Sequence, residues 1–213
     1  MRGTTSNILF ALLGLMLLAG CATTTTTTTN RNTACANVLA KINNGWCNEC
    51  EVGYVAGVTI NSPMLFEALD AHGHEIGSKG VQCASCRQAI QIDGYCDRHQ
   101  IGWVNQQAYF STLTYRLAKG QSKDISKIAC PICQANAQTQ GWCDSCQVGM
   151  VGNVAFGNKE DFQQASQPYE VLVAAAEMAG TCEMCATAML FDSTCPVCKI
   201  SYINGKKTPL PRP

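Results

Sequence analysis

The segment Cys130-Pro131-Ile132-Cys133 is followed nine residues later by Cys143-Asp144-Ser145-Cys146. A short hairpin between two such Cys-x2-Cys pairs would bring four sulfur atoms around one point. Aromatic residues make up only 7% of the chain, and its 15 cysteines are an equal share. We therefore expect the cysteines, through metal or disulfides, to supply much of the stability and to decide the fold.

The same spacing recurs along the chain. Its complete copies are Cys83, Cys86, Cys96 and His99; Cys130, Cys133, Cys143 and Cys146; and Cys182, Cys185, Cys195 and Cys198. An earlier copy is incomplete and retains only the second pair, Cys47 and Cys50. Equal spacing places Ala34 and Asn37 at its first pair, with Cys35 between them. The chain is thus predicted to consist of four copies of one unit.

Short apolar segments follow the second pair of every copy. Large apolar residues alternate there with glycine or serine, which predicts short, half-buried strands. These segments are residues 52–55, 101–104, 148–151 and 200–203.

Helix-like segments then follow in the first three units, with apolar residues three or four positions apart. They cover residues 64–71, 106–119 and 158–179. Asn158 is expected to cap the third segment, and Pro168 to break it into two helices. We expect each apolar stripe to pack on the hairpin of its own unit. The predicted fold class is α+β, with four tandem β-hairpin units, the first three followed by short helices.

Thiolate and imidazole ligands in a tetrahedral arrangement suit zinc, so zinc is the expected cofactor of the complete copies. His99 distinguishes best between bound zinc and disulfide bonds, because histidine can replace a cysteine as a zinc ligand but cannot form a disulfide. Its alternative interpretation is a surface histidine. In the first unit, the expected ligands are Cys35, Cys47 and Cys50. His72 and His74 could complete that site.

The repeated block resembles the zinc-ribbon superfamily, particularly the tandem form called a double zinc ribbon. That resemblance rests on the paired cysteines and their nine-residue separation, and it implies that each pair is a knuckle supplying two ligands to one ion. The chain departs from the family in lacking glycine after the pairs. Residues Glu51, Arg87, Gln134, Gln147, Ala186 and Lys199 stand there instead.

Other chemistry is compatible with the same cysteines. Structural disulfides are the main alternative if the protein is exported to an oxidising compartment. A rubredoxin-like iron centre would use the same four sulfurs. Cys-x2-Cys also resembles thioredoxin-type redox motifs, but those normally begin a helix, whereas we expect the present pairs in turn-rich hairpins.

The N-terminal residues resemble the leader of a bacterial lipoprotein. Residues 1–20 contain Arg2 and a short apolar run, and Leu18-Ala19-Gly20-Cys21 resembles the lipobox. That resemblance implies cleavage before Cys21 and acylation of its thiol. A plain secretory signal or a membrane-spanning helix are the alternatives, although the apolar run is short for spanning. The resemblance also implies a lipid-anchored location in the cell envelope and, because Ala22 is not aspartate, in the outer membrane facing the periplasm if the organism is Gram-negative.

The resulting organisation has seven parts. They are a signal peptide (1–20), a lipidated threonine-rich tether (21–32), a degenerate ribbon unit with a helix (33–80), two complete units with helices (81–127 and 128–180), a terminal unit (181–207) and a proline-rich tail (208–213).

Composition also limits the function. The formal net charge is zero, which offers no basis for nucleic-acid binding. No catalytic motif is visible, so we do not expect an enzyme. The sequence favours a membrane-anchored, zinc-binding envelope lipoprotein that acts as a structural or protein-interaction scaffold, with an envelope protein as partner. The alternatives are a thiol-based redox or electron-transfer protein and a disulfide-stabilised scaffold without metal.

Overall fold

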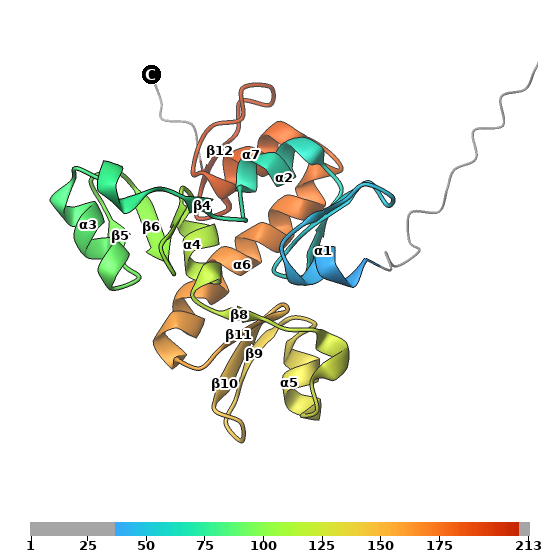
Figure 1. Ribbon diagram of the computed structural model, residues 1–213. Coiled ribbons are helices and arrows are strands. Elements are labelled where there is room, and N and C mark those ends of the chain that lie inside the picture. The colour runs from blue at the N-terminus through green and yellow to red at the C-terminus, as the bar shows by residue number, and fades with distance from the viewer. Residues whose placement is uncertain (1–36, 209–213) are drawn as a thin grey trace, which may run out of the picture. The chain divides into compact units, whose positions relative to one another are not determined.

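A computed structural model describes residues 37–208 (Figure 1). Within this range, helices alternate with small antiparallel sheets, which confirms the α+β class. The leader, the tether with Cys21, and Cys35 lie outside the described residues, as does the tail after Thr208. No helix among residues 37–208 has the length and apolar character needed to cross a membrane.

The first unit contains a three-stranded sheet in the order β1-β2-β3. Its elements are α1 (Val38–Ile42), β1 (Trp46–Cys47), β2 (Val52–Val55), β3 (Val58–Ile60) and α2 (Pro63–Leu69).

The second unit has a four-stranded sheet in the order β4-β7-β6-β5. Its elements are β4 (His74–Glu75), a 3-10 helix (Ser78–Gly80), α3 (Ala84–Gln91), β5 (Tyr95–Cys96), β6 (Ile101–Val104), β7 (Gln107–Tyr109) and α4 (Thr112–Ala118). The edge strand β4 lies in the range 33–80 of the expected first unit, but it pairs with β7 and so belongs to the sheet of the second unit.

The third unit repeats that plan with the order β8-β11-β10-β9, and the fourth is reduced to one hairpin. The third contains β8 (Gln121–Ser122), a 3-10 helix (Ile125–Lys127), α5 (Pro131–Asn136), β9 (Gln140–Cys143), β10 (Val148–Val151), β11 (Val154–Phe156) and α6 (Lys159–Ala179). The fourth contains α7 (Glu183–Leu190), β12 (Ser201–Ile203) and β13 (Lys206–Thr208).

The predicted strands are confirmed by β2, β6 and β10, which have the expected bounds, and by β12, which begins one residue later. The glycine within the first three lies directly beneath an aromatic ring of the following helix. In the third unit that ring belongs to Phe162, which a side chain at Gly149 would overlap. Phe162 also contacts Trp142, opposite Gly149 across the strands, with ring centroids 5.8 Å apart. The helix therefore packs on its own hairpin through one ring.

The same arrangement is repeated in two other units. Gly53 lies beneath Phe66, and Gly102 lies beneath Tyr115. In the fourth unit, Ser201 stands where the other units have this glycine, and Thr194 stands opposite it, where they have an aromatic residue. The hydroxyl groups of Ser201 and Thr194 are 2.7 Å apart. A hydrogen bond thus replaces the aromatic contact where no further helix follows among the described residues.

The expectation for Pro168 is wrong, because α6 continues through it as one helix. Proline has no N–H, so the carbonyl oxygen of Gln164 loses its usual helical donor. The guanidinium group of Arg116 donates to that oxygen at 3.4 Å. Burial of Ala165 and Leu172 on both sides of Pro168 holds the helix against the core. The capping prediction is confirmed, since the side chain of Asn158 accepts from backbone N–H groups of the first turn.

The segment 106–119 was expected to be one helix and is instead a strand followed by a helix. Residues Gln107–Tyr109 form β7, and α4 begins at Thr112. Phe110 lies between the two and is half exposed, so it does not belong to the apolar face of the helix. Pairing with β4 and β6 satisfies the backbone groups of β7 and overrides the helical spacing.

The main apolar core is shared between units and lies around α6, which contacts α4, α7 and β3. Ala165, Leu172 and Ala175 of α6 are fully buried in it. Leu65 and Leu69 of α2 belong to the same cluster. The apolar faces of the helices therefore also pack against other units. This corrects the expectation that each face packs only on the hairpin of its own unit.

Candidate metal centres

Each complete block supplies its ligands from two local structures. The first cysteine of the block is the N-cap of a helix, and the second lies in its first turn. The helices are α3 after Cys83, α5 after Cys130 and α7 after Cys182. This location corrects the expectation that all pairs sit in hairpin turns. The second pair does sit at a turn, between two short antiparallel segments.

The block of the second unit brings Cys83, Cys86, Cys96 and His99 together, with all ligand atoms within 4.8 Å of one another. The Nδ1 atom of His99 lies 3.3 Å from Sγ of Cys86 and 3.8 Å from Sγ of Cys96. Cys86 and Cys96 are buried beside Trp103, whereas His99 is exposed. The histidine expected from the spacing thus lies where a fourth ligand is needed.

The two all-cysteine blocks have the same compactness. Sγ of Cys130 lies 3.9 Å from Sγ of Cys143. Sγ of Cys182 lies 3.9 Å from Sγ of Cys195 and 3.7 Å from Sγ of Cys198. Zinc–sulfur bonds of about 2.3 Å in a tetrahedron separate neighbouring sulfurs by about 3.8 Å. A disulfide would need about 2.05 Å.

Burial follows one order in all three clusters. The first ligand is partly buried, the second and third are buried, and the fourth is exposed. Every cysteine in these clusters carries a free thiol. The fourth unit differs in its surroundings, since Cys185 and Cys195 belong to the main core around α6. An ion in any of the clusters would thus have two ligands on its protein side and one facing solvent.

Within each cluster, some cysteine thiols have a lowered pKa and others a raised pKa. The backbone N–H of Cys86 lowers the pKa of Cys83 to about 6, and that of Cys133 lowers the pKa of Cys130 to about 7. Burial, followed by the neighbouring cysteines, raises the pKa of Cys86 and of Cys133 to about 12. Crowded thiolates repel one another, so complete ionisation requires a cation among them.

The fourth unit shows the same division, but in its second pair of cysteines. Burial opposes ionisation of Cys195, but the backbone N–H of Cys198 and further hydrogen bonds lower its pKa to about 7. Hydrogen bonds with Cys185 and Cys182 raise the pKa of Cys198 to about 12. Cys195 therefore loses its proton far more readily than Cys198.

The residue after each cysteine pair is not glycine, and the reason differs between the first and the second pair of a block. After the second pairs, the backbone adopts the left-handed conformation for which glycine is favoured, with φ of 53° at Gln147 and 56° at Lys199. Glu51 and Gln100 do the same in the first two units. After the first pairs, residues such as Gln134 continue a right-handed helix and have no need of glycine.

In the first unit, Asn37 replaces the second cysteine of the first pair. Its Nδ2 lies 3.8 Å from Sγ of Cys47 and donates toward it, while its Oδ1 caps α1 through the N–H of Ala40. Within residues 37–208, no group of three or more potential ligands includes Cys47 or Cys50. The predicted ligand Cys35 lies outside the described residues, so the proposed first site stays a prediction.

His72 and His74 do not gather with Cys47 and Cys50, so they do not complete the first site. They lie instead around Asp70, and these three side chains form a further group with metal-ligand chemistry among the described residues. The signal in the sequence was their alternate spacing, Asp70-x-His72-x-His74. Such a spacing in a glycine-containing loop does not by itself distinguish metal ligands from solvated histidines.

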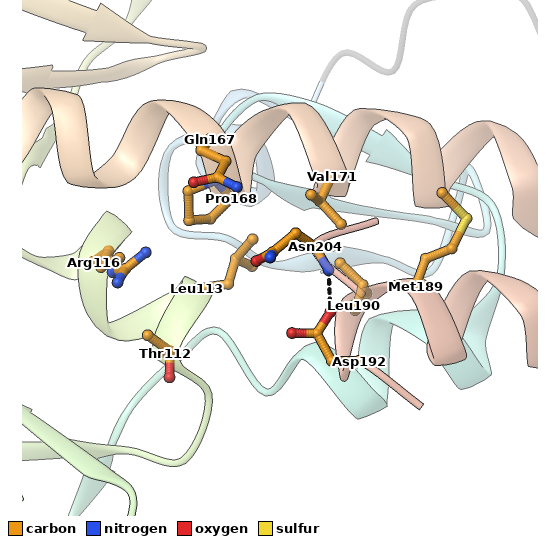
Figure 2. A pocket seen from close by; sticks show the side chains of 10 residues that line it. All are labelled: Thr112, Leu113, Arg116, Gln167, Pro168, Val171, Met189, Leu190, Asp192 and Asn204. Carbon is orange, nitrogen blue, oxygen red and sulfur yellow. Dashed lines mark hydrogen bonds between the residues drawn. The ribbon is translucent and has the colours of Figure 1, made fainter. Parts of the chain in front are cut away.

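A cavity of about 230 Å³ lies between α4, α6 and α7 (Figure 2). Leu113 and Val171 line it, and Arg116 faces it from α4. The carboxylate of Asp192 at its lower edge accepts a hydrogen bond from the backbone N–H of Asn204. This volume is below the usual range for small-molecule pockets, about 300 Å³ and above.

Comparison with protein-family models, curated proteins and solved structures finds no significant match. The fold and the ligand clusters together define a cysteine-rich α+β protein with repeated candidate metal centres.

Proposed function

We propose that the chain is a zinc-binding protein in which zinc-ribbon-like units hold structural metal. The observation that carries this proposal is the convergence of four ligand atoms in each of three repeated blocks. Four protein ligands complete the tetrahedral coordination of zinc and leave no position for a substrate. The metal then acts by stabilising small units whose local apolar clusters contain few residues.

The sulfur distances favour zinc over disulfides. Separations of 3.7–3.9 Å between cysteines of different pairs match the edge of a zinc–sulfur tetrahedron. His99 supports the same choice, because it stands 3.3 Å from Cys86 and has no role in a disulfide framework.

The proposed role is a scaffold tethered to the cell envelope, in contact with another envelope protein. Its support is the lipobox-like segment ending at Cys21 and the threonine-rich residues that follow it. Lipid on Cys21 would attach the zinc-stabilised units to the membrane surface through a polar spacer. This role involves no reaction at the cysteine blocks, because four protein ligands close each metal site.

One observation favours thiol redox chemistry as a second candidate. Cys83 caps the N-terminus of α3 and has a pKa lowered to about 6, while Cys86 in the same Cys-x2-Cys pair has a pKa raised to about 12. A reactive and a protonated thiol at a helix start are the arrangement of thiol oxidoreductases. The convergence of the second pair on the same point distinguishes the present site from a simple dithiol.

Metal analysis of the purified full-length protein, combined with thiol counting after denaturation, tests the proposal. We expect a colourless protein with at least one zinc ion for each of the three complete blocks and with free thiols throughout them. Iron–thiolate bands in the visible spectrum would contradict zinc and indicate an iron centre for electron transfer. Disulfides without metal, which open on mild reduction, would support the redox candidate.

A further inference from the structure

Asp70, His72 and His74 converge at the junction between the first and second units. Asp70 ends α2 in the left-handed conformation, with φ of 47°, and His74 begins β4. Gly73 between the histidines also has a positive φ, and a side chain there would meet the ring of Tyr109. The backbone therefore turns tightly enough to direct alternate residues toward one point.

The ligand atoms of the group are close together. Oδ2 of Asp70 lies 2.7 Å from Nε2 of His74, and Oδ1 lies 3.4 Å from Nδ1 of His72. All ligand atoms of the three residues lie within 4.8 Å of one another. The carboxylate thus lies between the two imidazoles and presents a different oxygen to each.

His74 is the best anchored member. Its backbone pairs with Ala108 of β7, and its ring lies between those of His72 and Phe110, at centroid distances of 4.8 Å and 5.2 Å. The half-exposed Phe110 thereby gains a partner. The side chain of Asp70 is 27% exposed and that of His72 is 65% exposed, so an ion could enter from solvent on the side of His72.

We propose that Asp70, His72 and His74 form an open site for a divalent transition-metal ion, with zinc as the reference ion. Two imidazole nitrogens and one carboxylate oxygen are borderline-hard ligands that suit such ions. Three protein ligands leave a coordination position for water or an external ligand, unlike the closed cysteine clusters. The site shares no residue with those clusters and does not depend on their holding metal.

Zinc titration of the full-length protein, after its cysteine clusters have been loaded, measures this site. We expect one further zinc ion to bind, and the ring resonances of His72 and His74, but not those of His99, to shift in nuclear magnetic resonance spectra. Asp70→Asn and His74→Ala should each weaken this last step by about tenfold or more while leaving the zinc of the cysteine clusters unchanged. Asparagine tolerates the left-handed conformation of Asp70, so the first variant should keep the fold.

Glu75→Gln is the matched control, because Glu75 is an exposed acidic residue of β4 outside the group. It should bind the additional zinc ion as the parent does. Absence of zinc binding beyond the cysteine clusters, or unchanged binding in both Asp70→Asn and His74→Ala, would reduce the group to a hydrogen-bonded Asp–His arrangement. Unshifted ring resonances in the parent protein would do the same, whatever the folding of the variants. The proposal for the cysteine clusters would stand in each case.

Discussion

Nδ1 of His99 lies 3.3 Å from Sγ of Cys86, a residue 13 positions earlier in the chain. In the other complete clusters, the position of His99 is occupied by Cys146 and Cys198. The structure thus brings an imidazole to a position that elsewhere holds a thiol. Metal ligation accommodates that exchange, whereas disulfide bonding does not.

Substitution of His99 tests this relationship. His99→Cys should keep one zinc ion in the second unit, because the other clusters already use four cysteines. His99→Ala should leave three thiolates and an open position, and should lower the zinc affinity and thermal stability of this unit. Zinc stoichiometry and thermal melting of both variants provide the measurement. An alanine variant that matches the parent in both would remove His99 from the ligands.

Proton release should accompany zinc uptake. The pKa values of Cys86 and Cys133 are raised to about 12, so both thiols keep their protons at neutral pH until metal displaces them. The metal-bound state therefore holds fewer protons, and zinc affinity should fall as the pH falls and rise as the pH rises. Calorimetric titrations in two buffers with different ionisation enthalpies measure the protons released. Equal apparent enthalpies in both buffers would contradict thiol ligation.

Gly149→Ala should destabilise the third unit by about 1–3 kcal/mol, because the added methyl group would overlap the ring of Phe162. Gly157→Ala is the matched control, since a side chain at Gly157 meets no atom within 4 Å. It should change the free energy of unfolding by no more than about 0.5 kcal/mol. Denaturant unfolding of both variants measures the difference. Equal stabilities would mean that the ring of Phe162 does not hold α6 on its hairpin.

Cys21→Ser should release the protein from the membrane, because Cys21 is the proposed lipid acceptor. The serine hydroxyl cannot replace the thiol in that modification. Fractionation of cells that express the parent and the variant measures the effect. Thr29→Ser, placed beyond the proposed leader and outside the ligand sets, should remain in the membrane fraction. Recovery of Cys21→Ser with the membranes to the extent of the parent would reject the lipid anchor.

Local spacing made several features predictable from the sequence. The ligand sets of the complete blocks follow from spacing because each set lies within a short stretch, and the structure brings each of them together. The strands after the second pairs were predictable because apolar residues alternate with glycine. Asn158 was recognisable as a cap because its interaction involves only the next turn.

Tertiary structure decided what depends on partners from elsewhere in the chain. By length alone, the nine residues between the cysteine pairs suit a hairpin. In the second unit most of them instead continue the helix α3, and Ala89 of this helix is buried beside Trp103. Pro168 stays within α6, where the core buries Ala165 and Leu172 on both sides of it and Arg116 of another unit donates to the carbonyl oxygen of Gln164. The turn between Asp70 and His74 is local, but His74 is held in place by the pairing of β4 with β7, whose residues lie more than thirty positions later. Spacing specifies contacts within one turn or hairpin, whereas these contacts form only when distant segments bury a common surface.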